Sequence, residues 1–252
     1  MEAVARRTVP DLVGALGELV ATRSQAPARI ERLPDATATL LVREAIAGPH
    51  ELFVVGPLTR ALLKVAAPWR LSIQVEIRAG AAQRVLGVPA RVLVDRIVRL
   101  DELWGARARR LEGELHDARG LDDKLTVLIG ALRQRVHAAM ELPAATLARR
   151  ALAMLDRQTG EPRIAEIAET LGVSARHLRR VFREAIGISP KELARMRRLR
   201  RAIGAAHGGA AWSIVAAAAG YYDQAHLIGE FRRLVGTTPE RWRASQRTVT
   251  PS

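Results

Sequence analysis

Four arginines in the segment SARHLRRVFREAIGISP, residues 174–190, are spaced so that their side chains would share one face of a helix. They are Arg176, Arg179, Arg180 and Arg183, at positions i, i+3, i+4 and i+7. A guanidinium group donates hydrogen bonds to two acceptors of guanine or clamps a phosphate, and a helix fits the major groove of DNA. The chemistry that this spacing allows is therefore the recognition of double-stranded DNA.

The segment DQAHLIGEFRRLVGTTP, residues 223–239, repeats the same scaffold 49 residues further along the chain. The matched pairs are Leu178 with Leu227, Phe182 with Phe231, Gly187 with Gly236, and Pro190 with Pro239. Upstream, IAEIAETLG and WSIVAAAAG match at an offset of 48, so the second turn is one residue longer. Ser174 and Asp223 are equivalent, and both residue types cap helix N-termini by accepting a backbone N–H bond. The sequence therefore predicts two helix-turn-helix units.

The apolar pairs of the repeat predict which face of each second helix is buried. Leu178 with Phe182, and Leu227 with Phe231, stand four residues apart and would hold the second helix on the first. The opposite face stays free, and in the first copy it carries the arginines. A stripe of arginines alone more often marks a solvated helix face, but its place in a basic helix-turn-helix favours DNA.

The positive charge of the chain is concentrated in its C-terminal part. The net charge is +14 over 252 residues. From Ala144 onward there are 19 Arg and Lys against 9 Asp and Glu, whereas the first 143 residues hold 21 against 17. A polyanionic partner is therefore expected for the C-terminal part alone. A basic surface that serves solubility is the plainer alternative.

No group of residues supports an enzymatic or metal-dependent activity. The chain has no cysteine, which excludes disulfides, thiolate zinc sites and cysteine nucleophiles. The six histidines are scattered without metal-ligand spacing, and no Gly-rich loop could cradle a phosphate. We therefore expect no enzyme, no cofactor and no metal. No apolar stretch is long enough for a signal peptide or a membrane span, so we expect a cytoplasmic protein.

The N-terminal half begins with strand-like segments and continues with helical ones. Short apolar segments between residues 39 and 80 (TLLVREAI, ELFVVGP, ALLKVAA and LSIQVEI) predict an antiparallel sheet or small barrel. From about residue 82 the period changes, and residues 90–100, 101–120 and 121–140 predict amphipathic helices.

The last of these helices carries an apolar stripe. The stripe comprises Leu125, Leu128, Ile129, Leu132 and Val136. It would either pack on a helix at 103–117 or form the seam of a dimer. Asp122 or Asp123 is the expected N-cap of this helix.

Pro143, in ELPAA, breaks the helical pattern and marks the expected domain boundary. We expect an α+β protein, with a β-rich domain with a helical end at 1–140 and a helical DNA-binding domain at 144–248. The second domain is predicted to contain helices at 144–158, 163–171, 174–186, 190–206, 212–219, 223–235 and 239–246. Its basic run RMRRLRR, residues 195–201, would contact phosphates or form a solvated helix face.

Residues 165–243 closely resemble the DNA-binding domain of the AraC/XylS-type regulators, a family of bacterial transcription factors. IAEIAETLGVSARHLRRVFREAIGISPKELARMRRLRRA is similar to the first helix-turn-helix of that family and its linker helix. GYYDQAHLIGEFRRLVGTTPERWR is similar to the second, with its Gly, Phe, Gly, Thr-Pro and terminal Trp-Arg landmarks. The resemblance implies two recognition helices held about one DNA turn apart by a helix at 190–206, each entering a major groove.

The resemblance also implies which residues read DNA. In the first unit the base-reading positions fall on Arg176, Arg179 and Arg180. In the second they fall on Gln224, Ala225, Ile228 and Gly229, where the family more often has arginine at the position of Gly229. Phosphate contacts are expected from Arg232 and Arg233, and Arg183 is a further DNA-binding residue of the first unit. The first unit is therefore expected to read most of the sequence, and the second to position the protein and lengthen its footprint.

RLPDATATLLVR, VVGPLT and VEIRAGAAQRVLGVPARVLVDRIVRLDELWG resemble an N-terminal domain of unassigned function found in one subgroup of the same family. Ala36 and Ala79 stand where that pattern has Gly and Pro. The resemblance implies a small-molecule effector or a homodimer contact in this half, and effector-binding residues are unknown. Candidates for a pocket wall are Trp69, Trp104, Phe53 and Arg78, although the aromatic residues could equally be ordinary core.

Double-stranded DNA is thus the expected partner, with RNA polymerase, a small effector and a second copy of the chain as further partners of such a regulator. The main alternative is a small-molecule-binding or scaffold protein whose basic half binds nucleic acid without sequence preference. An alkyl-transfer repair enzyme, known among relatives of this helix-turn-helix type, would need the cysteine that this chain lacks.

Overall fold

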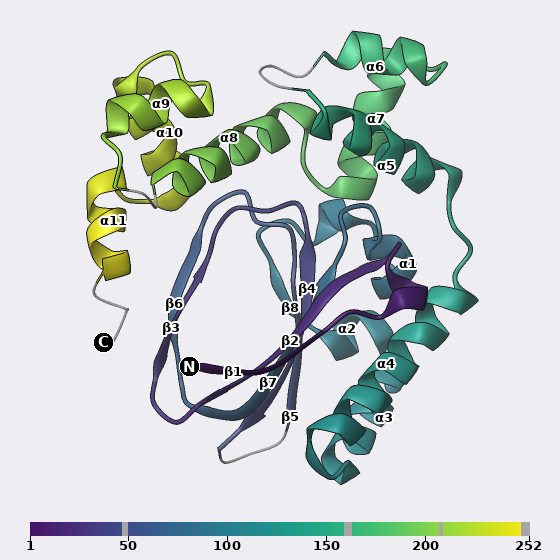
Figure 1. The fold of residues 1–252 in the computed structure, drawn as a ribbon. Coiled ribbons are helices and arrows are strands. Elements are labelled where there is room, and N and C mark those ends of the chain that lie inside the picture. The colour runs from purple at the N-terminus through teal and green to yellow at the C-terminus, as the bar shows by residue number, and fades with distance from the viewer. Residues whose placement is uncertain (47–49, 159–162, 207–208, 248–252) are drawn as a thin grey trace.

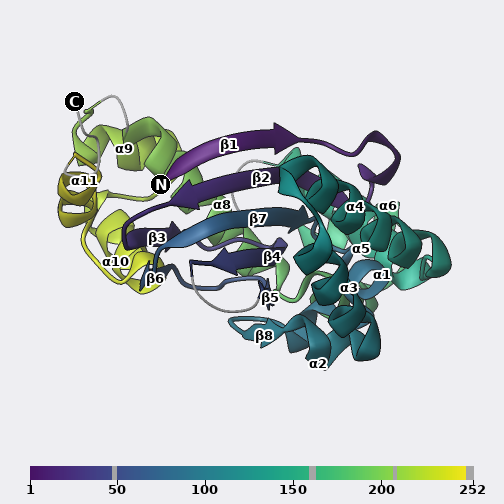
Figure 2. The ribbon, with the colours of Figure 1, turned by 90° about the horizontal axis from the view of Figure 1, so that it is seen from below.

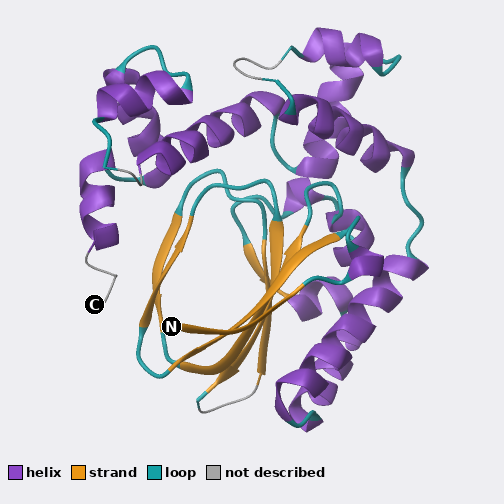
Figure 3. Ribbon diagram, in the orientation of Figure 1, coloured by secondary structure: helices purple, strands orange, loops and turns teal. Residues whose placement is uncertain are grey.

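The computed structural model describes residues 1–46, 50–158, 163–206 and 209–247. It confirms the α+β class, with a β-rich N-terminal region followed by a helical C-terminal region (Figure 3). The strands are β1 (Glu2–Arg7), β2 (Leu16–Ser24), β3 (Ala28–Arg32), β4 (Ala38–Ala45), β5 (His50–Val55), β6 (Leu62–Ala66), β7 (Trp69–Ile77) and β8 (Ile97–Arg99).

The helices fall into two groups along the chain. Those of the N-terminal region are α1 (Ala82–Leu86), α2 (Leu100–Trp104), α3 (Ala106–Asp117) and α4 (Gly120–Ala138), with short 3-10 turns η1 (Pro10–Leu12) and η2 (Ala90–Val92). Those of the C-terminal region are α5 (Pro143–Asp156), α6 (Ile164–Thr170), α7 (Ala175–Ile186), α8 (Pro190–Ala206), α9 (Trp212–Ala219), α10 (Gln224–Val235) and α11 (Pro239–Arg247). None of the described helices is both long and apolar enough to cross a membrane.

Six strands form an open antiparallel sheet in the order β1-β2-β7-β4-β5-β8 (Figure 2). In β4, Leu40 and Val42 point to one face, and in β7, Ile73 and Val75 point to the same face. Helices α1 to α4 cover this face, and together they enclose the main apolar core. The sheet prediction is therefore confirmed, while the small barrel is not formed.

Strands β3 and β6 pair only with each other and form a separate two-stranded ribbon. The ribbon stands off the face of the sheet opposite to α1–α4 (Figure 1). One end of it reaches the C-terminal helices, where Leu33 and Ala61 pack against the apolar cluster that contains Phe231 and Trp242.

The structure corrects three expectations about the N-terminal helices. Residues 90–100 do not form a helix, because they contain the turn η2 and the edge strand β8. Helix α4 begins at Gly120 with Arg119 as N-cap, so Asp122 and Asp123 lie in its first turn instead of capping it. The apolar stripe of α4 is buried in the core against α1 and α3, so the interpretation as a dimer seam is wrong.

All seven helices predicted for the C-terminal region are present within two residues of their expected ends. Helix α5 begins at Pro143, where proline's missing N–H is not needed for a helical bond. The buried residues of α5 pack with those of α7, and Ala36 of the N-terminal region joins the same cluster. The division of the chain at residues 140–144 therefore stays a prediction.

Candidate nucleic-acid interface

Helix α7 is built as the second helix of a helix-turn-helix. Ser174 Oγ accepts a hydrogen bond from the backbone N–H of His177, as its N-cap role predicts. Leu178 and Phe182 are fully buried against α5 and α6. At the other end Gly187 closes the helix with φ 93°, a left-handed conformation that glycine adopts without strain.

The opposite face of α7 carries the predicted guanidinium groups. Arg176, Arg179, Arg180 and Arg183 are all exposed, and within the described residues none of them forms an ion pair with a carboxylate. Within the described residues, His177 Nδ1 lies 3.3 Å from an Nη2 atom of Arg180, and Arg183 acts on Glu192 through its charge. The four guanidinium groups are therefore free to bind an outside acceptor.

A cleft of about 580 Å³ runs beside this face. Besides Arg179, Arg180 and Arg183 it is lined by Lys191 from the first turn of α8 and by Arg91 from η2. Lys191 is exposed. Arg91 instead forms an ion pair with Glu184. The basic surface of α7 thus continues onto α8.

The second unit repeats the architecture with a different exposed face. Asp223 Oδ1 accepts the backbone N–H of His226 at 2.7 Å, while Leu227 and Phe231 are fully buried. The exposed face of α10 carries the predicted residues Gln224, Ala225, Gly229, Arg232 and Arg233, together with the half-buried Ile228. Only the two arginines of this set are charged, so the second unit presents a weaker cationic surface.

The longer second turn places two tyrosines before α10. Tyr221 is buried, its ring lies edge-on to His226, and burial raises the pKa of its hydroxyl. Tyr222 is 93% exposed directly before the N-cap of α10. Sequence analysis did not single out Tyr222. The signal that could have found it is the second turn of the repeat, which is one residue longer than the first.

Helix α8 joins the two units and spans about 25 Å at 1.5 Å per residue. Figure 1 shows α6 and α7 at one end of α8 and α9 and α10 at the other end. Helices α7 and α10 therefore stand at opposite ends of one helix.

The basic run 195–201 on α8 is not simply a solvated helix face, while its contact with phosphates stays a prediction. Its arginines contact other parts of the chain: Arg195 pairs with Glu230, Arg197 with Asp156, Arg200 with Asp35, Arg198 stacks over the Tyr221 ring, and Arg201 donates to the carbonyl of Ala219. The run is therefore mainly an internal tether, because carboxylates from three other segments converge on it.

Both units also contact the N-terminal region. In the first unit, a Cβ at Gly187 would lie 2.9 Å from a methyl carbon of Val94, so α7 ends in close contact with the η2 segment. In the second, the indole N–H of Trp242 donates to Glu31 Oε1 at 2.6 Å, and the N–H of Ala61 donates to the carbonyl of Leu234 at 2.7 Å. The N-terminal region thus holds the two units in one relative orientation.

The residues suggested as a pocket wall in the N-terminal region do not share one cavity. Trp69, Trp104 and Arg78 line three different cavities, and Phe53 is half-buried beside Arg99. The turns that contain Ala36 and Ala79 do come together, at a cavity of about 390 Å³ between the sheet and helices α5 and α8.

Residues 167–245 match a protein-family model described as a helix-turn-helix domain. This part of the chain is a helix-turn-helix domain of the AraC type, and the resemblance is confirmed there. No curated protein matches the chain.

Solved structures of ToxT from Vibrio cholerae are similar to the chain. ToxT from strain O395 has 12% identity and a TM-score of 0.43, over 89% of this chain and 95% of that one. ToxT from strain SCE256 with an unsaturated fatty acid bound has 11% identity and a TM-score of 0.45, over 90% and 94%. Similarity at this level assigns no ligand and no activity to the present chain.

Proposed function

We propose that this protein is a sequence-specific DNA-binding transcription regulator whose two helix-turn-helix units read successive major grooves. One observation carries the proposal: the four arginines on the free face of α7 are exposed and form no ion pair with any carboxylate of the described residues, while Leu178 and Phe182 on the other face are fully buried. Such a helix can enter the major groove and place guanidinium forks against guanine.

The two units have different roles in this proposal. Arg176, Arg179 and Arg180 read bases, and Arg183 holds a phosphate. On α10, Gln224 bonds adenine, Ala225 and Ile228 contact thymine methyl groups, and Arg232 and Arg233 hold phosphates. Since α10 offers fewer charged donors, the first unit supplies most of the sequence preference.

The N-terminal region, residues 1–140, would modulate the DNA-binding region, residues 144–248, in a cytoplasmic regulator of a bacterial gene. The contacts of Glu31 and Asp35 with Trp242 and Arg200 support this division of labour, because they tie the sheet region to the second unit and its linker. A small effector, RNA polymerase and a second copy of the chain are the further partners that such a regulator would use.

Selection of random duplexes on the purified full-length protein tests the proposal. Two units on one face of DNA predict enrichment of a single asymmetric site of roughly 16–20 base pairs. Guanine contacts are expected in the half that α7 occupies. A pool that stays random, with equal affinity for all duplexes, would instead support a scaffold that binds nucleic acid without sequence preference.

A further inference from the structure

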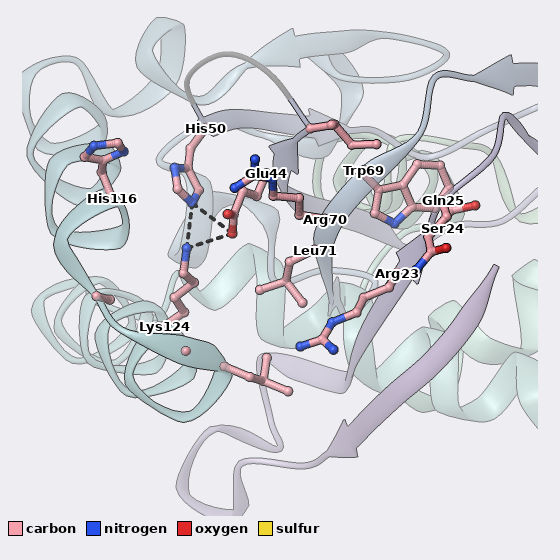
Figure 4. A pocket seen from close by; sticks show the side chains of 14 residues that line it. Arg23, Ser24, Gln25, Glu44, His50, Trp69, Arg70, Leu71, His116 and Lys124 are labelled. Carbon is pink, nitrogen blue, oxygen red and sulfur yellow. Dashed lines mark hydrogen bonds and ion pairs between the residues drawn. The ribbon is translucent and has the colours of Figure 1, made fainter.

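A second cavity, of about 630 Å³, lies at the end of the sheet away from α8, between the sheet and the connection from α3 to α4 (Figures 1 and 4). The ends of β2, β4, β5 and β7 supply one wall, and α3 and α4 supply the other. It is separate from the DNA-reading faces and from the cavity between the sheet and α8.

Three ionisable side chains form the base of this cavity. Lys124 Nζ lies 2.8 Å from Glu44 Oε2 and 3.0 Å from His50 Nε2, and both Lys124 and His50 are more than nine-tenths buried. Burial and the charge of Lys124 lower the pKa of His50, so its ring is neutral and accepts from the ammonium group. Burial raises the pKa of Glu44, but the hydrogen bond and charge of Lys124 outweigh it and lower the pKa. Lys124 and Glu44 therefore cancel in charge.

Two further cations flank this base, and one of them, Arg70, acts on Glu44 through its charge. Arg23, near the end of β2, and Arg70, near the start of β7, are exposed and line the cavity. Neither forms an ion pair within the described part of the chain. Figure 4 shows Arg70 beside Glu44, and Arg23 extending from the end of β2 to a point below Leu71 in this view. The cavity thus has an excess of two positive charges.

Apolar and hydrogen-bonding groups complete the cavity. Trp69 is 2% exposed, and its indole N–H has no hydrogen-bond partner among the described residues. A buried donor without an acceptor is unfavourable. Leu71 and Leu121 add apolar surface beside it. An ion pair that only anchors α4 to the sheet would require neither the cavity, nor the unpaired arginines, nor the unsatisfied indole.

We propose that this cavity binds a small organic oxyanion, with a carboxylate or phosphate group held by Arg23 and Arg70 and an apolar or aromatic portion against Trp69, Leu71 and Leu121. Arginine forms bidentate, charge-assisted hydrogen bonds with both kinds of oxyanion. In the regulator proposed above, this molecule would be the effector, so its regulatory meaning rests on that proposed function. The binding of the anion to the cavity does not rest on that function, because it is measured in the absence of DNA.

Isothermal titration calorimetry of the full-length protein tests the site with three probes: phenyl phosphate, 4-phenylbutyrate and the uncharged 4-phenylbutan-1-ol. At least one anion is expected to bind ten times or more tightly than the alcohol, and the tighter of the two anions identifies the head group. No heat of binding from either anion, or equal affinity for the alcohol, would overturn the proposal.

A pair of matched double variants locates the site. Arg23→Gln with Arg70→Gln removes the two flanking charges at exposed positions, and we expect anion affinity to fall at least tenfold. Arg60→Gln with Arg109→Gln removes the same charge at exposed positions outside the cavity and should bind as the unaltered protein does. If both double variants lose anion affinity equally, or if the Arg23 and Arg70 variant keeps its affinity, the anion does not bind in this cavity.

The two proposals fail separately. If the double variant of Arg23 and Arg70 loses anion binding but keeps its DNA sequence preference, the cavity is a ligand site whether or not it regulates. If the unaltered protein shows no DNA sequence preference, the proposed function is contradicted, whereas the measured affinity of the cavity for the anion still stands.

Discussion

Arg195 of the linker helix α8 and Glu230 of the second recognition helix α10 form an ion pair, with Nε 2.9 Å from Oε1. Glu230 is buried, on the face of α10 opposite to the exposed Gln224 and Gly229. The pair therefore helps to orient α10 on α8, with Gln224 and Gly229 on the exposed side of α10.

Removing the Glu230 carboxylate should destabilise the second unit. In Glu230→Ala the partly buried Arg195 loses its partner, and breaking a buried pair from one side costs about 3 kcal/mol. Glu230→Gln keeps the shape and one hydrogen-bond acceptor, so its loss should be clearly smaller. Urea denaturation measures both. Equal stability of Glu230→Ala and the unaltered protein would show that the pair does not hold α10 in place.

Gly229 is a position where the chain has room for a side chain. A Cβ there meets no atom within 4 Å, and α10 is regular at this residue. Gly229→Ala should therefore raise the free energy of unfolding by up to about 1 kcal/mol. Gly236→Ala is the control, because φ is 82° there and alanine is strained in that conformation. Thermal melts should move in opposite directions for the two variants.

Gly229→Arg should strengthen DNA binding at low salt. The new guanidinium lies on the exposed face of α10, and one added phosphate contact steepens the dependence of log affinity on log salt by about 0.9. Gly113→Arg adds the same charge on α3, where a Cβ also meets nothing within 4 Å. Fluorescence anisotropy with labelled DNA at several salt concentrations measures the slope for both variants, and only Gly229→Arg should have the steeper slope. An unchanged slope for Gly229→Arg would show that residue 229 does not face the DNA backbone.

His50 should make stability depend on pH between neutral and mildly acid conditions. Its pKa in the folded protein lies below the ordinary 6.5, mainly because of burial. The unfolded chain then binds this proton more readily, so the contribution is complete above pH 6.5 and is lost as the pH falls through the folded pKa. Each unit of pKa difference corresponds to about 1.4 kcal/mol.

Urea denaturation at pH 7.5 and pH 5.5 checks this dependence. The loss in the free energy of unfolding from pH 7.5 to pH 5.5 should be smaller in His50→Gln than in the unaltered protein. It should persist in the control His137→Gln, which changes an exposed histidine of α4. Glu44 does not interfere, because its lowered pKa places its loss below pH 4.5. An unchanged loss in His50→Gln would contradict the account.

Local patterns predicted the parts of the fold that depend on neighbours in sequence. The caps Ser174 and Asp223 were found from residue type and repeat offset, because an N-cap bonds a backbone N–H three residues away. The strands β1, β2 and β3 were missed, because the predicted sheet began only at residue 39 and the partners of β2 and β3, strands β7 and β6, lie far along the chain. The segment 90–100 has helical periodicity, yet Val98 pairs with β5 as the last strand of the sheet.

The partners of the basic run on α8 could not be predicted from the sequence either. Arg197 and Arg200 pair with Asp156 and Asp35, and nothing in the spacing of the run tells which distant carboxylates lie opposite it. The same holds for the Glu44–His50–Lys124 group, whose members are brought together by the packing of α4 on the sheet.

The base-reading role of α7 is tested most directly by single substitutions of its central arginines. Arg179→Ala and Arg180→Ala each remove one exposed guanidinium and no buried surface, so the fold should stay intact. Arg109→Ala, on the exposed face of α3, removes an arginine far from the interface and serves as control.

The deciding measurement is the ratio of affinities for the selected duplex and a scrambled duplex of the same composition. Base reading predicts that Arg179→Ala or Arg180→Ala lowers affinity for the selected site by about 1–3 kcal/mol and reduces this ratio, whereas Arg109→Ala leaves it unchanged. Equal weakening on both duplexes, with the ratio preserved, would contradict the claim that these guanidinium groups touch bases.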